Sequence, residues 1–379
     1  MTSVPPPAPP PSSPPLFMFD PAAAHQLLGL TLPGGWIVTK KIPVPVAGEG
    51  DPGHTGGNFS VGYEAERDGK KGFVKALDLG GAMRAIPDDI MLAMGKLVVD
   101  HQFEATLLDI CAKASLDRIV KVLAKGQISI QGAGGFPVPI PFFVFELAEE
   151  GDFRKAVARS QVIDDAWRLR ILHQVAVALQ QLHGVAIAHQ DIKPSNVLVF
   201  KDVEAKLGDL GRASHNDSSL RAAHDDLYIA GARNYAPPEQ AYGVKATEWR
   251  DRREGCDLYQ LGCLICFAFT GTTPTAAYME LPKNILAREW GGLWAGTYEM
   301  IFPQIAATFS SYLEKIRALF PAWAADDLLI MVSQLCTPEY LKRGAPESRV
   351  FQNSPIGIDR FITRLDVLAK KAAIQVHAQ

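Results

Sequence analysis

The sequence has few cysteines and little net charge, and each shortage excludes a class of protein. Five cysteines stand among 379 residues, in odd number and at irregular spacings, which excludes a disulfide-rich secreted scaffold and predicts free thiols. Cys263 and Cys266 form a CxxC pair without a second pair nearby, so we expect buried helix packing rather than a zinc or redox site. The formal net charge of −3 gives no reason to expect a nucleic acid as partner.

Long apolar runs are also missing. No stretch reaches the ~20 apolar residues that a membrane-spanning helix needs. Residues 1–15 have neither a basic region nor a hydrophobic segment, so no signal peptide is expected. With 47% hydrophobic and 21% charged residues, the composition is that of an ordinary globular protein. We therefore predict a soluble, cytoplasmic chain with no membrane span.

The chain divides into segments of different character. Residues 1–16 are rich in proline and predict a disordered tail, either passive or a docking ligand for an aromatic-lined groove on a partner. Residues 17–35 form an N-terminal extension. Residues 36–148 are strand-like around one helical stretch, and residues 149–379 are mainly helical. This change predicts two lobes of α+β class, joined near residues 146–152.

One short loop, residues 189–196, carries groups that suit phosphoryl transfer. That reaction asks a protein for positioning, metal ions and stabilisation of negative charge rather than for covalent chemistry. Asp191 offers a carboxylate to the attacking hydroxyl, and Lys193 can reach the transferred phosphate. Asn196 and the later Asp209, in Asp-Leu-Gly, offer the hard oxygen ligands that Mg²⁺ prefers. The spacing of these groups indicates a phosphotransferase.

These residues resemble the catalytic loop and metal-binding motif of the protein kinase superfamily. The resemblance covers about residues 36–365, and Lys193 is typical of the eukaryotic-like serine/threonine enzymes. It implies a bilobal kinase fold, with a small antiparallel-sheet N-lobe that has one main helix and a larger, mainly helical C-lobe. It also implies ATP and Mg²⁺ as cofactors and a protein as substrate. Asp191 would position the Ser or Thr hydroxyl, and Asn196 and Asp209 would hold the Mg²⁺.

The resemblance assigns further residues to the nucleotide. Lys75, in an apolar strand-like frame, resembles the lysine that holds the α- and β-phosphates. Glu104 is the single glutamate within residues 67–145 and would be its partner. The backbones of Glu146 and Ala148 would bind the adenine at the hinge between the lobes.

Other matching residues would support the site. Asp152 stands where family members often contact the ribose, although a carboxylate at a helix N-terminus is an equal interpretation. His189 flanks the catalytic loop, and Asp257 would accept backbone hydrogen bonds from that loop. Glu239, in the Pro-Pro-Glu sequence that ends the activation segment, would pair with Arg343. If buried, this pair would lock the segment in place.

The glycine-rich loop that should cover the phosphates fits the family pattern poorly. Gly57 and Phe59 match and are assigned to nucleotide binding, whereas Ser60 and Gly62 replace a glycine and a valine. Backbone amides can still hold phosphates in such a loop. An insertion over about residues 80–96 is a candidate regulatory element.

Gln190 departs from the pattern in a second place. Many kinases have an arginine there, which binds a phosphorylated activation loop, so the resemblance is to the non-RD type. We therefore expect loop phosphorylation to be dispensable, with Ser214, Ser218 and Ser219 in a solvated loop. Ala232 replaces the threonine that helps serine/threonine kinases to recognise a hydroxyl substrate.

Three functions remain open from the residues. The first is an active serine/threonine protein kinase, for which the full set of catalytic residues argues. The second is a pseudokinase scaffold, for which the irregular glycine loop argues. The third is a small-molecule kinase of related fold, but such enzymes usually lack a lysine at the place of Lys193 and the Pro-Pro-Glu segment with its arginine.

Overall fold

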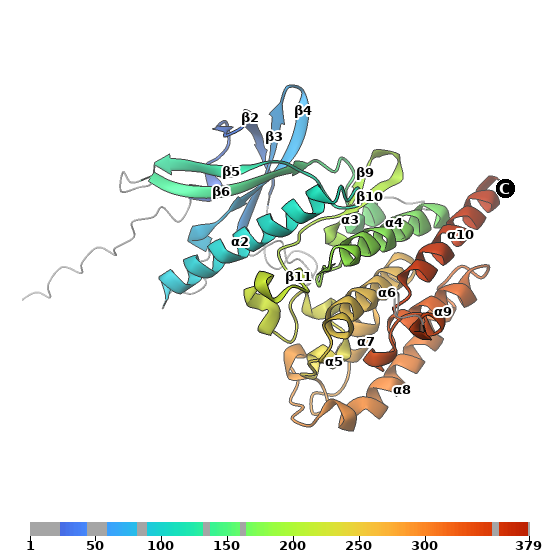
Figure 1. The fold of residues 1–379 in the computed structure, drawn as a ribbon. Helices are drawn as coiled ribbons and strands as arrows, with labels where there is room; N and C mark the ends of the chain where they lie inside the picture. Colours follow the sequence, from blue (N-terminus) through green and yellow to red (C-terminus); the bar gives the residue numbers. More distant parts are fainter. Residues whose placement is uncertain are drawn as a thin grey trace, which may run out of the picture.

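The computed structural model describes residues 23–43, 59–81, 89–131, 137–159, 164–350 and 356–377. The proline-rich residues 1–16, Gly57 and most of the loop before Phe59 lie outside these ranges, as do residues 82–88 of the expected insertion. The described chain forms an antiparallel sheet crossed by one long helix, next to a larger helical body (Figure 1). This is the bilobal α+β fold that the sequence predicts.

Six antiparallel strands form the sheet in the spatial order β1-β2-β3-β4-β6-β5. Their bounds are Thr31–Leu32 for β1, Trp36–Lys41 for β2, Ser60–Arg67 for β3, Lys70–Leu77 for β4, Val122–Gln131 for β5 and Pro137–Glu146 for β6. Along β3 the alternate residues Val61, Tyr63 and Ala65 are buried, because successive side chains of a strand point to opposite faces. Asp68 and Gly69 close the β3–β4 hairpin with φ angles of 51° and 73°, which Asp-Gly turns favour.

Helix α2, Ile90–Lys113, crosses one face of the sheet (Figure 1). It begins at a capped end, where Asp89 Oδ1 accepts a hydrogen bond of 2.9 Å from the Leu92 N–H. Its C-terminal half buries Leu107, Leu108 and Cys111 in the core. The helix therefore carries its middle residues, including Glu104, to a fixed height above the sheet.

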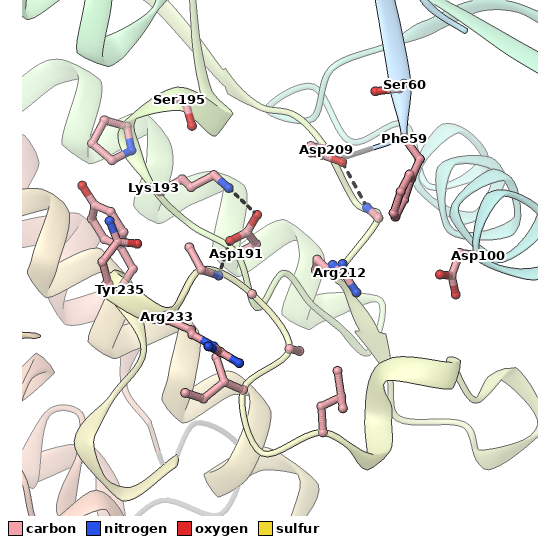
Figure 2. Close-up of a pocket in the computed structure, with 18 of the residues that line it drawn as sticks. Phe59, Ser60, Asp100, Asp191, Lys193, Ser195, Asp209, Arg212, Arg233 and Tyr235 are labelled. Carbon is pink, nitrogen blue, oxygen red and sulfur yellow. Dashed lines mark hydrogen bonds and ion pairs between the residues drawn. The ribbon is translucent and has the colours of Figure 1, made fainter. Parts of the chain in front are cut away.

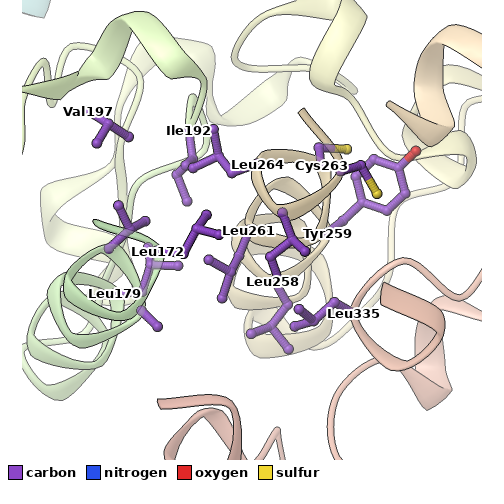
Figure 3. Packing of buried hydrophobic residues seen from close by; sticks show 14 of the residues in the cluster. Leu172, Leu179, Ile192, Val197, Leu258, Tyr259, Leu261, Cys263, Leu264 and Leu335 are labelled. Carbon is purple, nitrogen blue, oxygen red and sulfur yellow. The ribbon is translucent and has the colours of Figure 1, made fainter. Parts of the chain in front are cut away.

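The helical body is built around α6, Gly255–Thr270 (Figure 3). The other helices are α3 Phe153–Arg159, α4 Asp165–Gly184, α5 Pro238–Ala241, α7 Pro274–Met279, α8 Tyr298–Arg317, α9 Ala325–Leu335 and α10 Ile358–His377. Leu258, Leu261 and Leu264 of α6 share one core cluster with Leu172 of α4 and Leu335 of α9. Because α6 is buried almost throughout, it can act as a rigid base for the loops that lie on it.

Short strands and single turns shape the face of the body that meets the sheet. β7 Gly151–Asp152, β9 Val197–Phe200 and β10 Glu204–Leu207 form one small sheet, and β8 Ile187–Ala188 pairs with β11 Ser214–His215. The 3-10 turns that matter below are η2 Pro194–Asn196, η4 Ser218–Leu220, η5 Ala223–Asp226 and η6 Arg233–Tyr235, and η7 Arg250–Glu254 is a turn of π-helix. Residues 189–196 thus connect β8 to β9 as one short loop.

All five cysteines are buried free thiols, as the sequence predicts. Cys263 and Cys266 belong to the core around α6, and the described part of the chain holds no cluster of His, Cys, Asp and Glu suited to a metal ion. Across the described ranges, each helix is too short or too polar to cross a bilayer.

Candidate active site

An open cavity of about 1100 Å³ lies where the sheet faces the helical body. Its lining includes Lys75 from the sheet, Phe59 from the turn before β3, Glu104 from α2, and Asp191 and Asp209 from the loops of the body. Figure 2 shows Lys193 pointing toward Asp191, with Asp209 apart from them and near Phe59. The residues assigned to phosphoryl transfer from sequence are therefore brought into one place.

Lys75 on β4 contacts two carboxylates. Its Nζ lies 2.9 and 3.0 Å from the two oxygens of Glu104 and 2.9 Å from Asp209 Oδ1. Burial lowers the pKa of the Lys75 ammonium, but Asp209 and Glu104 outweigh burial and hold that pKa above its ordinary value. In the same way burial raises the pKa of the Asp209 carboxyl, yet Lys75 outweighs it and leaves that pKa well below its usual range. Both groups are therefore charged at neutral pH.

Asp191 is held by three neighbours, Lys193, Asn196 and Ala232. Lys193 Nζ lies 2.9 Å from its Oδ2, and Asn196 Nδ2 donates to the same oxygen at 3.1 Å and to the Asp191 carbonyl at 2.8 Å. The backbone N–H of Ala232 donates to Oδ1 at 2.7 Å. Gly231 approaches so closely that a Cβ there would lie 2.2 Å from the Gln190 carbonyl oxygen, so only glycine fits. Residues 231 and 232 of the activation segment, the stretch from Asp209 to Glu239, thus pack directly on the residue expected to be the base.

Helix α6 fixes the backbone of the catalytic loop. Asp257 accepts hydrogen bonds from the N–H of His189 at 2.8 Å and of Gln190 at 2.7 Å. Gln260 accepts from the N–H of Ile192 at 2.8 Å and donates to the Gln190 carbonyl at 3.0 Å. Asp257 is fully buried, so these bonds are shielded from water. Sequence reasoning missed Gln260, although a polar residue three positions after Asp257 in an apolar run was the available signal.

His189 ties the catalytic loop to the segment that carries Asp209. Its Nε2 lies 3.0 Å from the carbonyl oxygen of Gly208, and the ring is fully buried. Asp191 lies two residues after His189, and Asp209 directly follows Gly208. The hydrogen bond between His189 and Gly208 therefore holds the loop of Asp191 close to the loop of Asp209.

Glu239 and Arg343 meet although 104 positions separate them in the chain. The two nitrogens of the guanidinium donate to the two carboxylate oxygens at 2.8 and 2.9 Å, and both side chains are buried. The Arg343 guanidinium also lies over the Tyr259 ring of α6 at 5.1 Å. The ion pair therefore attaches the end of the activation segment to the core of the helical body around α6.

The residues assigned to the adenine and ribose, Glu146, Ala148 and Asp152, are not among those that line the cavity. The Glu146 carboxylate accepts from Lys206 Nζ at 2.9 Å and from the Lys121 N–H at 2.8 Å, and the Glu146 N–H donates to the Lys121 carbonyl at 3.0 Å, so both the carboxylate and the N–H are already bound within the chain. The Ala148 carbonyl accepts from the Gly151 N–H at 3.1 Å. Asp152 Oδ1 accepts from the Lys155 N–H at 2.9 Å at the start of α3, which favours the helix-terminus interpretation over the ribose contact.

An aromatic stack lies next to Lys75, and His101 is the ring of this stack that lines the cavity. His101, one helical turn before Glu104, stacks on Phe143 with ring centroids 4.3 Å apart, and Phe143 lies 5.6 Å from Phe145. Burial and then the charges of Lys75 and Lys125 lower the pKa of His101 to about 4. His101 was not identified from sequence, and its spacing of three residues from Glu104 was the available signal.

The three loop serines differ in their surroundings. Ser218 and Ser219 are exposed on η4, as expected for a solvated loop. The expectation is wrong for Ser214, which is buried in β11 and accepts a hydrogen bond from Trp249 Nε1 at 3.2 Å. Its pairing with β8, which local sequence does not reveal, is the reason.

Known proteins resemble part of this chain. A family model described as the protein kinase domain matches residues 140–347. A probable serine/threonine-protein kinase PknB of Corynebacterium glutamicum is 30% identical over 162 residues, which are 43% of this chain and 23% of that protein. The MDIS1-interacting receptor like kinase 2 of Arabidopsis thaliana is 35% identical over 35% of this chain and 12% of its own length. The Aurora/IPL1-related protein kinase 2 of Caenorhabditis elegans is 28% identical over 38% of this chain and 44% of its own length. The matched part thus spans less than half of each of these relatives.

Proposed function

Because the chain belongs to the protein kinase domain family, we propose that it is an active serine/threonine kinase that transfers the γ-phosphate of ATP to a protein hydroxyl. One observation carries the proposal. Lys75 Nζ lies 2.9 Å from both Glu104 and Asp209, while Asp191 is held by Lys193 on the other side of the same cavity. A cation that can bind phosphate (Lys75), a carboxylate that can bind a metal ion (Asp209) and a base (Asp191) are thus arranged around one open cavity.

In this proposal the roles follow from the chemistry of each group. Asp191 hydrogen-bonds the substrate hydroxyl and takes its proton as the oxygen attacks phosphorus. Lys193, bound to Asp191, neutralises charge that develops on the transferred phosphate. Lys75 holds the remaining phosphates, and Glu104 fixes the direction of its ammonium. Ala232 contacts Asp191 through its backbone N–H, which does not depend on the threonine that it replaces.

The donor atoms near Asp191 and Asp209 suit Mg²⁺. The Nδ2 of Asn196 is occupied by Asp191, so the amide oxygen is the atom of Asn196 that would hold the ion. The Asp209 carboxylate, kept ionised by Lys75, would be the second ligand, and both donors are hard oxygens. When bound, Mg²⁺ would neutralise charge on the phosphates.

Several finer assignments belong to the same proposal. We assign residues 36–148, together with β1 of the N-terminal extension, to the N-lobe and residues 149–379 to the C-lobe. Backbone groups of Glu146 and Ala148 would bind the adenine, and Phe59 with Gly57 would cover the phosphates. Cytoplasmic location, a protein substrate and a docking partner for residues 1–16 are proposed on the same basis.

A kinase assay tests the function directly. The purified chain should transfer labelled phosphate from Mg²⁺-ATP to a generic protein, and acid hydrolysis should yield phosphoserine or phosphothreonine. Asp191→Asn should lower kcat by at least about a hundredfold, because the base is lost, while ATP binding persists. Phosphotyrosine alone, a phosphorylated metabolite, or ATP binding without any transfer would contradict the proposal.

A further inference from the structure

Position 190, directly before the proposed base, carries an uncharged side chain that one residue binds at both ends. Arg253 Nη1 donates to Gln190 Oε1 at 2.9 Å, and Gln190 Nε2 donates to the Arg253 carbonyl at 2.8 Å. The Gln190 backbone takes a φ of 66°, a left-handed angle that is costly outside glycine. Its N–H and carbonyl are held by Asp257 and Gln260. Every polar group of the residue next to Asp191 is therefore bound, and its side chain depends on Arg253.

Arg253 also reaches the activation segment. It lies in the π-helical turn η7 and is only 1% exposed. Its Nη2 donates to the Asp225 carbonyl at 2.8 Å and lies 3.2 Å from Asp225 Oδ1. The second carboxylate oxygen accepts from the Ala222 N–H at 2.9 Å. A buried cation needs a counter-charge, and Asp225 supplies one from the activation segment itself.

The short turn around Asp225 is attached on several sides. Arg252 Nη2 donates to the Asp225 carbonyl at 2.6 Å, and Lys245 Nζ donates to the Asp226 carbonyl at 2.7 Å. His224 donates from Nε2 to the Ala213 carbonyl at 2.7 Å, four residues after Asp209. Its ring also meets Phe103, the residue before Glu104, edge to face at 6.0 Å. The turn η5 therefore touches α2, the segment after Asp209 and, through Arg253, the catalytic loop.

The charges in this cluster replace those expected from a phosphorylated segment. An arginine at position 190 would be paired by an added phosphate, but here the cation stands at position 253 and a carboxylate already faces it. The exposed Ser218 and Ser219 lie on η4, outside this contact.

We propose that Asp225, through Arg253 and Gln190, permanently holds the activation segment on the catalytic loop, so that Arg253 is a positioning residue for Asp191. This inference rests on the proposed kinase function. It assigns to an aspartate of the chain the ordering role that phosphate has in kinases with an arginine at position 190.

The decisive comparison is Asp225→Asn against Asp226→Asn. The first change keeps the shape and one acceptor oxygen but removes the charge facing Arg253. The second removes a neighbouring carboxylate that pairs with Arg221 at the surface. We expect kcat of Asp225→Asn to fall at least about tenfold, as displaced catalytic groups do, with little change in KM for ATP. Asp226→Asn should behave as the wild type, and phosphatase treatment should leave wild-type kcat unchanged.

Hydrogen exchange gives a second readout that does not depend on activity. Amides of residues 218–232 should exchange faster in Asp225→Asn and not in Asp226→Asn. Arg253→Lys keeps the charge but cannot bind Gln190 and Asp225 with one planar group, so it should show the same loss. Asp225→Glu keeps the negative charge and should have a higher kcat than Asp225→Asn. It takes the place of Asp225→Asn as the test variant if Asp225→Asn does not fold.

Each outcome decides the matter. Unchanged or raised kcat in Asp225→Asn, or loss of wild-type activity after phosphatase treatment, would overturn the inference. If the wild type shows no kinase activity at all, the proposed function fails. Hydrogen exchange over residues 218–232 then still tests the inference. Faster exchange in Asp225→Asn but not in Asp226→Asn supports the proposal that Asp225 holds the activation segment on the catalytic loop. Equal exchange in Asp225→Asn and the wild type refutes it.

Discussion

At the scale of single residues, the site combines charges that stabilise one another with a ring that must stay neutral. Lys75 and Asp209 each keep the other ionised, with 2.9 Å between Lys75 Nζ and Asp209 Oδ1. His101 lies beside them, stacked on Phe143, where a positive charge would meet Lys75. Lys75 is charged at this side of the cavity, and it disfavours a second positive charge on His101.

This arrangement predicts a pH dependence. Burial, Lys75 on β4 and Lys125 on β5 lower the pKa of His101 to about 4, below its unfolded value of about 6.5. The neutral ring therefore contributes stability that is complete above about pH 6.5 and is lost as the pH falls through about 4. Urea unfolding of the wild type and of His101→Phe should show wild-type stability declining relative to the variant between pH 7 and pH 5. A constant difference across that range would contradict the lowered pKa.

At the scale of elements, ion pairs join segments that are distant in the chain. The pair of Glu239 and Arg343 connects the end of the activation segment to the turn after α9, and the two side chains are 6% and 1% exposed. The attraction between two charges buried this deeply adds little to stability, because the cost of desolvating both charges offsets most of it. The larger effect on stability comes from removing one partner, which leaves the other charge buried and unpaired.

Arg343→Met should therefore lower the free energy of unfolding by about 3–5 kcal/mol, because Glu239 is left buried without a partner. The double variant Glu239→Gln, Arg343→Met should be less destabilised than the single variant. Arg317→Met is the matched control, since Arg317 pairs with Asp326 at the surface of α8 with both side chains more than half exposed. It should change stability by no more than about 1 kcal/mol. Urea unfolding measures all three, and equal losses in both arginine variants would contradict the buried role.

At the scale of the whole molecule, the cavity has one wall from the sheet and one from the helical body. A ligand that touches both walls stabilises the folded state by mass action, by about 2.7 kcal/mol at a hundredfold excess over Kd. Mg²⁺-ATP should therefore raise Tm of the wild type. Removal of Mg²⁺ with EDTA should take away most of the rise.

Two aspartates separate the assignments within this experiment. Asp209→Asn should lose the Mg²⁺-dependent part of the rise in Tm, because the proposed carboxylate ligand to the metal is lost. Asp152→Asn should lower Tm without ATP, since its carboxylate caps α3, but should keep the rise. A rise that disappears in Asp152→Asn would restore the ribose contact.

How much could be predicted depends on sequence distance. Residues 189–196 lie in one loop, so their spacing alone was enough to place Asp191, Lys193 and Asn196 together. Glu104 was identified because no other glutamate competed for Lys75. The pairing of Glu239 with Arg343 came from resemblance, not from any local pattern.

The sequence by itself determined the two-lobed fold and the residues of the catalytic loop, because hydrophobic periodicity and a short loop are local properties. Only the tertiary structure decided the burial of Ser214, the capping role of Asp152 and the contact of Gln190 with Arg253 and Asp225. The last contact joins residues 63 and 28 positions apart. Hydrogen bonds between such distant residues depend on how α6 and the activation segment pack, and no pattern along the chain encodes that packing.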